Sequence, residues 1–338
     1  MTPDADIAKT PTQRWGVAWI VALAVAAALL VAVEFAWRAH GYGPNVIDSP
    51  QLWSAERDKV YGTDPRPLVL LGASRTEYGF DMRVLREELP GYRPVMLAVN
   101  GIYPLATLRD LARDPDFRGT VICDVESNAF LSEYAALQQP YVDYYHHHWT
   151  PSWRVHRALL DMWQRTAAIS NPDFGAIALV RRAFMTVPPL QNYVTYHADR
   201  SGDLDYTRTD PEGAKRHFAA VVETNVARLP KYTPDQWFVE VEKALADARA
   251  IEARGGRVIF YESPISGLNR DVMDRVYPPE LYWNRFAAAS PVAVVSARDF
   301  PSLTAFPLPD DSHIDWRDKA AYTRAVIGVL KAKGLLQP

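Results

Sequence analysis

The sequence has 338 residues, of which 48% are hydrophobic and 23% are charged, a globular composition with enough length to bury a sizeable core. The formal net charge is -3 and no stripe of Lys and Arg is interleaved with aromatic residues, so we expect no nucleic-acid partner. The single cysteine, Cys123, excludes an internal disulfide framework, and its apolar surroundings in VICDV predict a buried strand residue.

The N-terminal region contains a segment that is long enough to cross a membrane. Residues 15–33 carry no charge, and roughly twenty apolar residues in a helix span a hydrocarbon core ~30 Å thick. Trp15, Trp19 and Trp37 are placed to lie near the two interfaces. No convincing cleavage site of a secretory signal follows the segment, so we expect an uncleaved transmembrane helix over residues 15–37.

The charges that flank this segment are nearly balanced. Lys9 and Arg14 lie in the short tail of residues 1–14, and Arg38 follows the span. Basic residues concentrate on the cytoplasmic side of membrane spans, and both nearby basic residues of the tail lie before the span. We therefore expect a cytoplasmic tail, an anchor in a bacterial inner membrane and a large domain that faces the periplasm.

Residues 38–65 include the turn-rich segment GYGPNVIDSPQ and are expected to link the membrane to a domain of residues 66–338. In this domain helical patterns alternate with short apolar runs typical of buried parallel strands, namely PLVLLGAS, PVMLAVNG, GTVICDVESN, GGRVIFYESP and PVAVVSA. Helices are expected over Asp81 to Leu89, over YPLATLRDLARD and from Thr233-Pro234, a good cap and first-turn pair. The alternation predicts an α/β fold, in which helices cover both faces of a parallel sheet of about five strands.

Residues 132–231 break this alternation, and we expect them to form a largely helical insertion. The polar stretch HADRSGDLDYTRTDPEG within it is expected to be an exposed loop. Three adjacent histidines cannot all face one ion from a regular element, and no cluster of Cys, Asp or Glu joins them, so we expect no metal. The surrounding aromatic residues are instead interpreted as a substrate rim that can stack on sugar rings, formed by Tyr144, Tyr145, His147 and Trp149.

Ligands of open α/β sheets bind beyond the carboxyl ends of the strands, and short polar signatures fall at such places in this chain. They are Gly72-Ala73-Ser74, Asn100-Gly101, Ser127-Asn128 and Asp310-Asp311-Ser312-His313. A serine hydroxyl becomes a good nucleophile only when a base takes its proton, and that base needs an acidic partner. His313 and Asp310 supply both from one turn, so Ser74, His313 and Asp310 are the candidate nucleophile, base and acid.

Attack on an ester develops a negative oxygen, which backbone N–H groups and an amide side chain can stabilise. The candidate donors are the N–H groups of Ser74 and Gly101, with the amide of Asn128 or, alternatively, Asn100. Two plainer interpretations remain open at this stage. The D-x-x-H segment can serve only as a helix N-cap, and Glu262, at the end of the fourth strand, is either an active-site neighbour or a solvated strand end.

The order GAS, then NG, then an Asn after the third strand, then DxxH near the C-terminus resembles the SGNH (GDSL-type) hydrolase family over most of residues 66–334. The resemblance implies a flavodoxin-like α/β/α fold without a cofactor, with Ser74 as nucleophile, Gly101 in the second block and Asp310 and His313 as acid and base. The chain departs from the family in two places. It has ESN where the third block reads GxND, which weakens the assignment of Asn128, and Ala in place of the Asp of GDS, which is not the catalytic acid.

The GxSR form, the preceding anchor and the ending PDDSHIDW further resemble SGNH-like proteins of bacterial envelope gene sets that modify glycans with acyl groups. This likeness implies an O-acyl, expected to be acetyl, transferase or esterase of an envelope polysaccharide, with a membrane protein as a possible acyl donor. Hydrolysis and transfer share their first half-reaction, so the sequence does not separate them. The alternative is a catalytically inactive scaffold that binds glycan or organises a membrane assembly.

Overall fold

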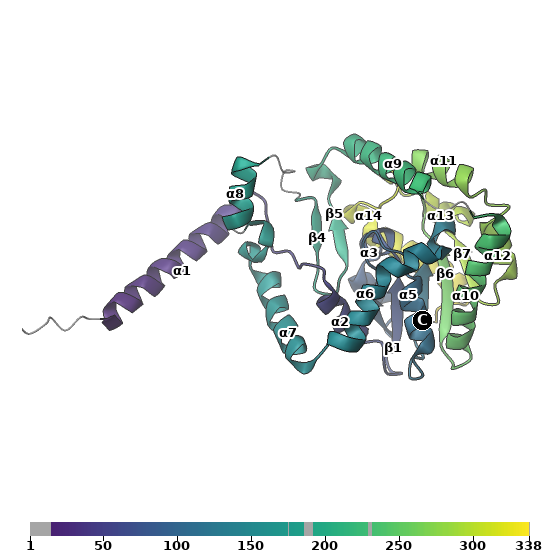
Figure 1. The fold of residues 1–338 in the computed structure, drawn as a ribbon, viewed down its shortest axis with the longest axis horizontal. Helices are drawn as coiled ribbons and strands as arrows, with labels where there is room; N and C mark the ends of the chain where they lie inside the picture. Colours follow the sequence, from purple (N-terminus) through teal and green to yellow (C-terminus); the bar gives the residue numbers. More distant parts are fainter. Residues whose placement is uncertain (1–14, 175, 186–191, 229–231, 338) are drawn as a thin grey trace, which may run out of the picture.

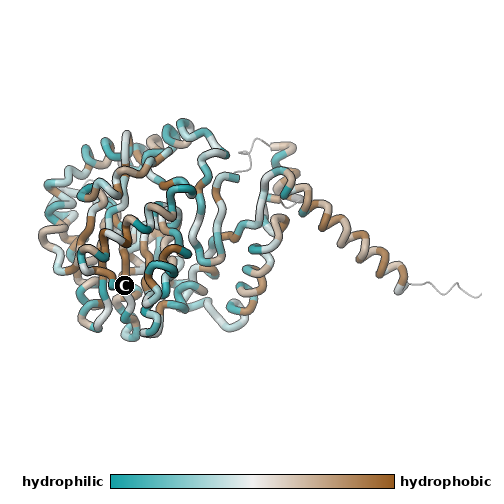
Figure 2. The backbone as a smooth tube through the Cα atoms, turned by 180° about the vertical axis from the view of Figure 1, so that it is seen from behind, coloured by the Kyte–Doolittle hydropathy of each residue, from teal (hydrophilic) through white to brown (hydrophobic). Residues whose placement is uncertain are grey.

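The computed structural model describes residues 15–174, 176–185, 192–228 and 232–337. The cytoplasmic tail expected over residues 1–14 lies outside these ranges. Helix α1 (Trp15–Ala39) extends away from the rest of the protein (Figure 1) and is hydrophobic along most of its length (Figure 2). By length and composition it can cross a membrane, and none of its residues is buried against the domain.

The centre of the domain is a parallel sheet of five strands in the order β2-β1-β3-β6-β7. The expected α/β fold is confirmed, and each of the five apolar runs overlaps one strand. In chain order the strands are β1 (Arg66–Leu71), β2 (Tyr92–Met96), β3 (Thr120–Asp124), β6 (Arg257–Glu262) and β7 (Ala293–Ser296). Cys123 is buried in β3, as its apolar surroundings predicted.

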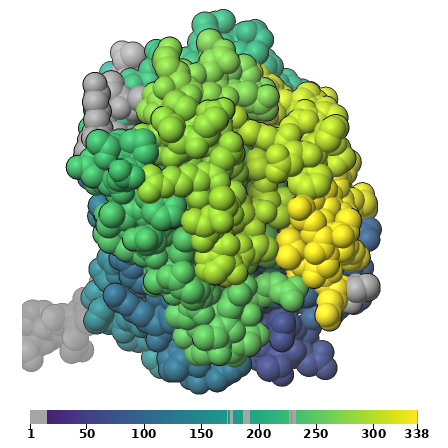
Figure 3. All heavy atoms as spheres, turned by 90° about the vertical axis from the view of Figure 1, so that its right-hand side faces the viewer, coloured from purple at the N-terminus to yellow at the C-terminus, as the bar shows by residue number. Residues whose placement is uncertain are grey.

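Both faces of the sheet are covered, which explains why its strands read as continuous apolar runs. Along β1, Val69 and Leu71 join one hydrophobic cluster with α5 (Leu105–Arg113), α10 (Pro234–Glu252) and α12 (Trp283–Ala289). Leu68 and Leu70 join a second cluster, with α4 (Met82–Glu88), α13 (Pro301–Thr304) and α14 (Trp316–Ala332). The surface that lies away from α1 is formed largely by the C-terminal half of the chain, green to yellow in Figure 3.

The helix starts follow their capping residues. Thr233 forms a capping box with Gln236, in which each side chain bonds the other residue's backbone N–H, so α10 begins where Thr233-Pro234 predicted. Asp81 caps α4 by accepting the N–H groups of Arg83 and Val84. These bonds satisfy backbone N–H groups in the first turn of each helix.

The segment expected to be a linker is residues 38–65, and its second half belongs to the domain. It contains α2 (Pro50–Arg57), whose Trp53 is fully buried and donates from Nε1 to the carbonyl oxygen of Leu97 at 3.2 Å. Arg57 is also buried and pairs with Asp110 at 2.9 Å and Asp114 at 2.8 Å. The linker expectation was wrong here because the partners that allow this arginine to be buried lie on and just after α5, far along the chain.

The insertion is helical but also contains a small sheet. Its helices are α6 (Ser132–His148), α7 (Pro151–Thr166), α8 (Ala176–Phe184) and α9 (Pro211–Arg228), and β4 (Val194–Tyr196) pairs antiparallel with β5 (Gly202–Leu204). The stretch expected to be an exposed loop forms β5 and buries Arg200. The guanidinium of Arg200 pairs with Asp48, through two contacts of 2.7 Å, and donates to the carbonyl of Met96 at 3.0 Å. These partners compensate the burial of its charge.

Candidate active site

Ser74 is the first residue of α3 (Ser74–Gly79), three residues beyond the end of β1. The turn that presents it requires glycine at position 72. A Cβ atom there would lie 1.9 Å from Oγ1 of Thr76 and 3.0 Å from Cβ of Asp124, so a larger residue would displace both neighbours. The glycine of the GAS block therefore has a steric role, and the serine lies half-buried at the carboxyl end of the sheet.

The structure brings the candidate nucleophile, base and acid together. Nε2 of His313 lies 2.8 Å from Oγ of Ser74, although 239 residues separate them. Nδ1 of His313 lies 2.7 Å from Oδ2 of Asp310. Both distances are within hydrogen-bond reach, which is the geometry that a base needs to activate a serine hydroxyl.

Asp310 is arranged to remain ionised. Burial alone would raise the pKa of Asp310, but the adjacent His313 and the hydroxyl of Tyr206 hold this pKa well below its ordinary value. The other carboxylate oxygen accepts the backbone N–H groups of Ser312, at 3.0 Å, and His313, at 2.8 Å. An ionised Asp310 holds the proton of His313 on Nδ1 and leaves Nε2 free to accept one from Ser74.

The D-x-x-H segment is not the cap of the last helix. The N-cap of α14 is Asp315, whose carboxylate accepts the N–H of Arg317 at 2.9 Å. Asp311 adopts a left-handed backbone conformation, with φ of 64°, and its carboxylate accepts the N–H of Leu268 at 3.3 Å. Neither Asp310 nor Asp311 therefore caps α14, the helix that follows them.

The candidate oxyanion donors differ in their availability. Gly101, with φ of 70°, and Asn128 line one cavity together with Ser74. The side-chain amide of Asn100 instead donates to the hydroxyl groups of Tyr78, at 2.8 Å, and Tyr196, at 3.2 Å. Because these tyrosines occupy the amide of Asn100, the geometry favours Asn128 as the side-chain donor.

The structure does not bring the expected substrate rim to Ser74. Tyr145 and Trp149 instead donate to the carboxylate of Asp58, at 3.2 Å and 2.7 Å. Neither of the cavities that Ser74 lines includes any of the four rim residues, which are Tyr144, Tyr145, His147 and Trp149. Tyr134, at the start of α6, does line one of them, and Tyr144 lies ten residues further along the helix, a rise of about 15 Å.

Three of the aromatic residues at the larger cavity come from β4 and the segments that flank the small sheet, which the sequence did not identify. Tyr193, Tyr196 and Tyr206 line the cavity beside Ser74. The rings of Tyr78 and Phe218 lie at the edge of His313, with centroids 5.8 Å and 5.5 Å from it. The sequence signal for this rim was Tyr206 in the polar stretch, together with Tyr193 and Tyr196 just before it.

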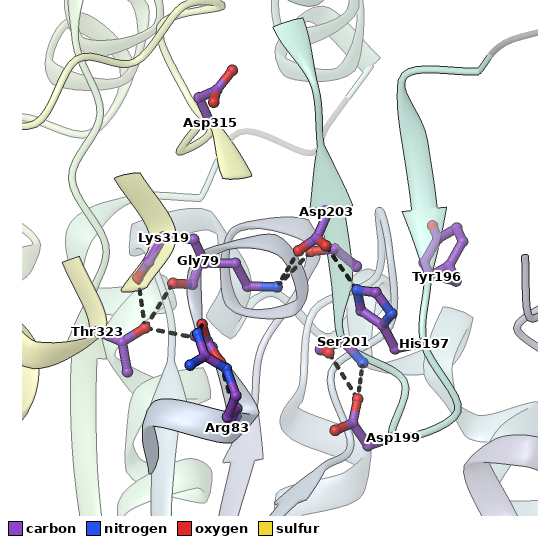
Figure 4. A network of polar contacts seen from close by, with 12 residues as sticks. Gly79, Arg83, Tyr196, His197, Asp199, Ser201, Asp203, Asp315, Lys319 and Thr323 are labelled. Atoms are coloured by element: carbon purple, nitrogen blue, oxygen red, sulfur yellow. Dashed lines mark hydrogen bonds and ion pairs between the residues drawn. The ribbon is translucent and has the colours of Figure 1, made fainter. Parts of the chain in front are cut away.

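The small sheet is joined to α14 through the buried Lys319 (Figure 4). Nζ of Lys319 donates to the carbonyl of Gly202 at 2.7 Å and to Asp203 at 3.0 Å, and His197 contacts the other oxygen of Asp203 at 2.8 Å. Although burial opposes this, His197 and Lys319 lower the pKa of Asp203 to about 2. These contacts fix the position of Tyr196 relative to Ser74.

A second set of polar residues joins the blocks of the site beneath Ser74. Oδ2 of Asp124 accepts the hydroxyl groups of Thr76, at 2.8 Å, and Ser263, at 2.7 Å. Arg75 donates to Glu126 at 2.7 Å and to Ser312 at 3.0 Å. These contacts hold the first, third and last blocks in register. The sequence signal for Asp124 was a carboxylate in an otherwise apolar strand.

Glu262 is a buried neighbour of the site rather than a solvated strand end. Its carboxylate accepts the hydroxyl of Ser296 and lies 3.6 Å from Arg298. Burial raises the pKa of Glu262 to about 7. It lines a cavity of about 170 Å³ with Glu126, which also lines a cavity beside Ser74.

The histidines of α6 make contacts within the protein. Nε2 of His146 lies 2.6 Å from Asp110, and Nδ1 of His147 lies 2.9 Å from the carbonyl oxygen of Asp143. Within the described ranges, no group of three or more His, Cys, Asp or Glu side chains is placed to hold a metal ion.

Neither a family model nor a curated protein sequence matches this chain. Among solved structures, TesA is similar over 79% of this chain and 99% of its own length, with 13% sequence identity and a TM-score of 0.35. A likeness of this degree assigns neither a family nor a function to the chain.

Proposed function

We propose that the protein is a membrane-anchored serine esterase or O-acyltransferase that acts on an acylated envelope polysaccharide. The observation that carries the proposal is the continuous hydrogen-bonded chain from Ser74 through His313 to Asp310. Its 2.8 Å contact between nucleophile and base favours an enzyme over an inactive scaffold. The order of blocks that resembles the SGNH family supports the same chemistry.

The reaction begins when Oγ of Ser74 attacks the carbonyl carbon of an ester while His313 takes the hydroxyl proton. The N–H groups of Ser74 and Gly101, with the amide of Asn128, bind the oxygen that becomes negative. His313 then gives its proton to the departing alcohol, which leaves an acyl group on Ser74. Water at this stage gives an esterase, and a sugar hydroxyl gives a transferase, for which a membrane protein would supply the acyl group.

We also propose where the domain lies and which molecule accepts the acyl group. Helix α1 anchors the domain in a bacterial inner membrane, and the domain lies in the periplasm, where envelope glycan is reached. The tyrosine-lined cavity beside Ser74 supports a sugar substrate, because aromatic rings stack on the apolar faces of sugar rings. No cofactor or metal enters the proposed reaction.

The proposal is tested by the turnover of p-nitrophenyl acetate by the full chain in detergent micelles. We expect Ser74→Ala and His313→Ala each to lower kcat by about 10³-fold or more. The matched controls are Ser302→Ala, on the exposed side of α13, and His147→Ala, which lies away from the site. Both controls should retain wild-type turnover. Equal activity in all five proteins, or none in the wild type, would contradict the proposal.

A further inference from the structure

Two cavities of different size and lining meet at Ser74. The smaller has a volume of about 160 Å³ and the larger about 800 Å³. They share Ser74, Gly101, Phe218 and Val221. A tetrahedral centre on Ser74 carries an oxyanion, an acyl chain and an alcohol oxygen. These three groups must be distributed between the two cavities.

The need to exchange a proton with His313 decides which cavity binds the alcohol. Among the two linings, His313 and Asp310 belong only to the larger cavity. The oxygen that leaves in the first step, and the hydroxyl that attacks in the second, must both reach Nε2 of His313 to exchange a proton. The alcohol therefore lies in the larger cavity.

The smaller cavity suits the oxyanion and a short acyl chain. Asn128, the favoured side-chain donor, lines it and does not line the larger one. Val222 and Met273 make part of its wall apolar, and the charge of Arg75 is compensated by Glu126. A water molecule takes up about 30 Å³ in the liquid, so the cavity holds on the order of five waters, which fits a short chain better than a long one.

Asn269, on α11 (Gly267–Val276), gives the smaller cavity a polar end. The side chain is only 2% exposed, and neither Oδ1 nor Nδ2 has a hydrogen-bond partner among the residues described. An apolar chain long enough to reach this amide would exclude water from it without offering a hydrogen bond, so the polar end favours a short acyl group. Nothing in the sequence pattern singles out this residue.

The larger cavity has the features of a sugar site. Its wall includes Tyr193, Tyr196 and Tyr206, and it extends to Asn45 and to Asp173. These residues offer aromatic faces together with amide and carboxylate groups, which suit a ring that carries many hydroxyl groups.

We propose that the smaller cavity binds the acyl group, with Asn269 as a residue that selects it, and that the larger cavity binds the sugar alcohol. The proposal rests on the acyl-serine chemistry proposed above. In the first step the ester C–O bond breaks as the C–Oγ bond to Ser74 forms, and His313 passes the serine proton to the sugar oxygen. In the second, a hydroxyl in the larger cavity gives its proton to His313 as its oxygen bonds the acyl carbon. The bond between the acyl carbon and Oγ then breaks, and His313 returns the proton to Oγ of Ser74.

The experiment compares two reporters in the full chain, with one variant for each cavity. The first reporter is the ratio of kcat/KM for p-nitrophenyl acetate to that for p-nitrophenyl hexanoate, and the second is the KM for glucose pentaacetate. Asn269→Ala should change the ratio about tenfold toward the longer chain and leave the KM for the sugar ester unchanged. Tyr193→Ala should raise that KM and leave the ratio unchanged.

A failure of the proposed function and a failure of the cavity assignment give different results. A wild-type protein that hydrolyses none of these esters would contradict the proposed function itself. An active wild type whose Asn269→Ala variant keeps its chain-length ratio, or whose two variants exchange their effects, would overturn the assignment of the cavities alone. Val222→Trp, which narrows the smaller cavity, should shift the ratio toward acetate and guards against a misfolded Asn269 variant.

A separate surface lies on the outer sides of α7 and α8. On α7, Val155, Leu159 and Met162 are 62%, 60% and 58% exposed, and their spacing puts them on one face of the helix. On α8, Ile177 and Phe184 are 79% and 85% exposed. Apolar side chains gathered in this way mark an interaction surface.

The segment between these helices is bonded to the end of α1. Glu34 accepts the N–H groups of Ala168 and Ile169, each at 2.9 Å, and the ring of Trp37 stacks on Phe174 with centroids 4.1 Å apart. Helix α1 has 25 residues and is therefore about 37 Å long, more than the ~30 Å of a hydrocarbon core. With α1 across a membrane, its last turns and the bonded segment lie at the interface.

We infer that α7 and α8 lie on the same bilayer, with these apolar faces among the lipids. The occupant is lipid because the surface continues from the end of α1, and because Arg165 and Arg181 accompany the apolar residues, as is usual in helices that lie on membranes. Trp163, 48% exposed at the end of α7, suits the interface.

The test uses single cysteine variants of the full chain in liposomes, labelled with a fluorophore that lipid-borne nitroxides quench. The native Cys123 is fully buried and leaves little background. Leu159→Cys and Ile177→Cys should be quenched by nitroxides near the headgroups, whereas Val239→Cys, exposed on α10, should not. Leu23→Cys, within α1, reports that the chain is inserted. Labels at residues 159 and 177 that resist lipid quenchers, whether open to water or shielded by protein, would overturn the inference.

Discussion

The contact between Oδ2 of Asp310 and Nδ1 of His313 sets which nitrogen of the imidazole can act as a base. In Asp310→Asn the amide oxygen can still accept the backbone N–H groups of Ser312 and His313, so the amide nitrogen would face Nδ1 and favour the wrong tautomer. We expect kcat for p-nitrophenyl acetate to fall by up to about 10⁴-fold with little change in KM.

The neighbouring Asp311 provides the control for this variant. Its carboxylate contacts Ser266 and the N–H of Leu268 rather than the imidazole. Asp311→Asn should therefore keep most of the activity. A loss of activity as large as that of Asp310→Asn would mean that the turn, and not the tautomer, is what the aspartate controls.

Glu77 makes stability depend on pH. Burial raises the pKa of Glu77 from 4.5 to about 8, and neither of its oxygens has a hydrogen-bond partner among the described residues. Between these two values the unfolded chain loses the proton while the folded chain keeps it, so the wild type loses stability as pH rises from about 5 to 8. Glu77→Gln should have a higher Tm than the wild type at pH 8 and nearly the same Tm at pH 5.

Thermal unfolding followed by circular dichroism at both pH values checks this prediction. Glu87→Gln, an exposed carboxylate on α4, should change neither Tm. A Glu77→Gln variant that is less stable at pH 8 would show that the pairing of Glu77 with Arg200, at 3.9 Å, outweighs the cost of its burial.

At this scale, the residues that form the hydrogen-bonded chain could be predicted because each lies in a short block at a strand end or before the last helix. Tyr145 and Trp149 could not be placed correctly. Their partner is Asp58, in a segment that looked like a linker, and nothing in the local sequence shows this distant contact. Arg200 was missed for the same reason, since the Asp48 that pairs with it is distant in the chain.

The small sheet β4–β5 depends on α14 for its position. Lys319→Met would leave the carbonyl of Gly202 and the carboxylate of Asp203 without their buried cation. We expect the free energy of unfolding to fall by about 1–3 kcal/mol. We also expect the KM for glucose pentaacetate to rise more than the KM for p-nitrophenyl acetate, because Tyr196 and its neighbours line the larger cavity.

Urea unfolding and steady-state kinetics measure the two effects. Lys331→Met, near the other end of α14, removes a lysine that contacts only the carbonyl of Glu88 and should change neither quantity appreciably. A Lys319 variant that is less stable but keeps the KM values for both esters would show that the position of the small sheet does not affect substrate binding.

Among the elements, the parallel strands were predictable because both faces of the sheet are buried, which makes each strand a continuous apolar run. The strands β4 and β5 have three residues each, too few to show a period of two. Helix α2 was missed because it lies in a segment rich in turn-forming residues, and its burial depends on partners elsewhere.

For the molecule as a whole, the testable expectation is its orientation. A fusion of alkaline phosphatase to the C-terminus should be active in cells, because the domain that follows α1 is proposed to lie in the periplasm. A cytoplasmic reporter at the same position should be inactive. The opposite pair of results would contradict the periplasmic assignment without bearing on the chemistry of Ser74.

The bonds between α1 and the segment before α8 give the proposed anchor a mechanical consequence. A flexible tether lets a domain sample many heights above a membrane, whereas Glu34 and Trp37 join α1 directly to the folded insertion. With α1 in a bilayer, Ser74 is then held at a fixed distance from the membrane surface. A glycan chain presented at that height meets the serine at a high effective concentration, and acylation becomes a function of distance from the membrane.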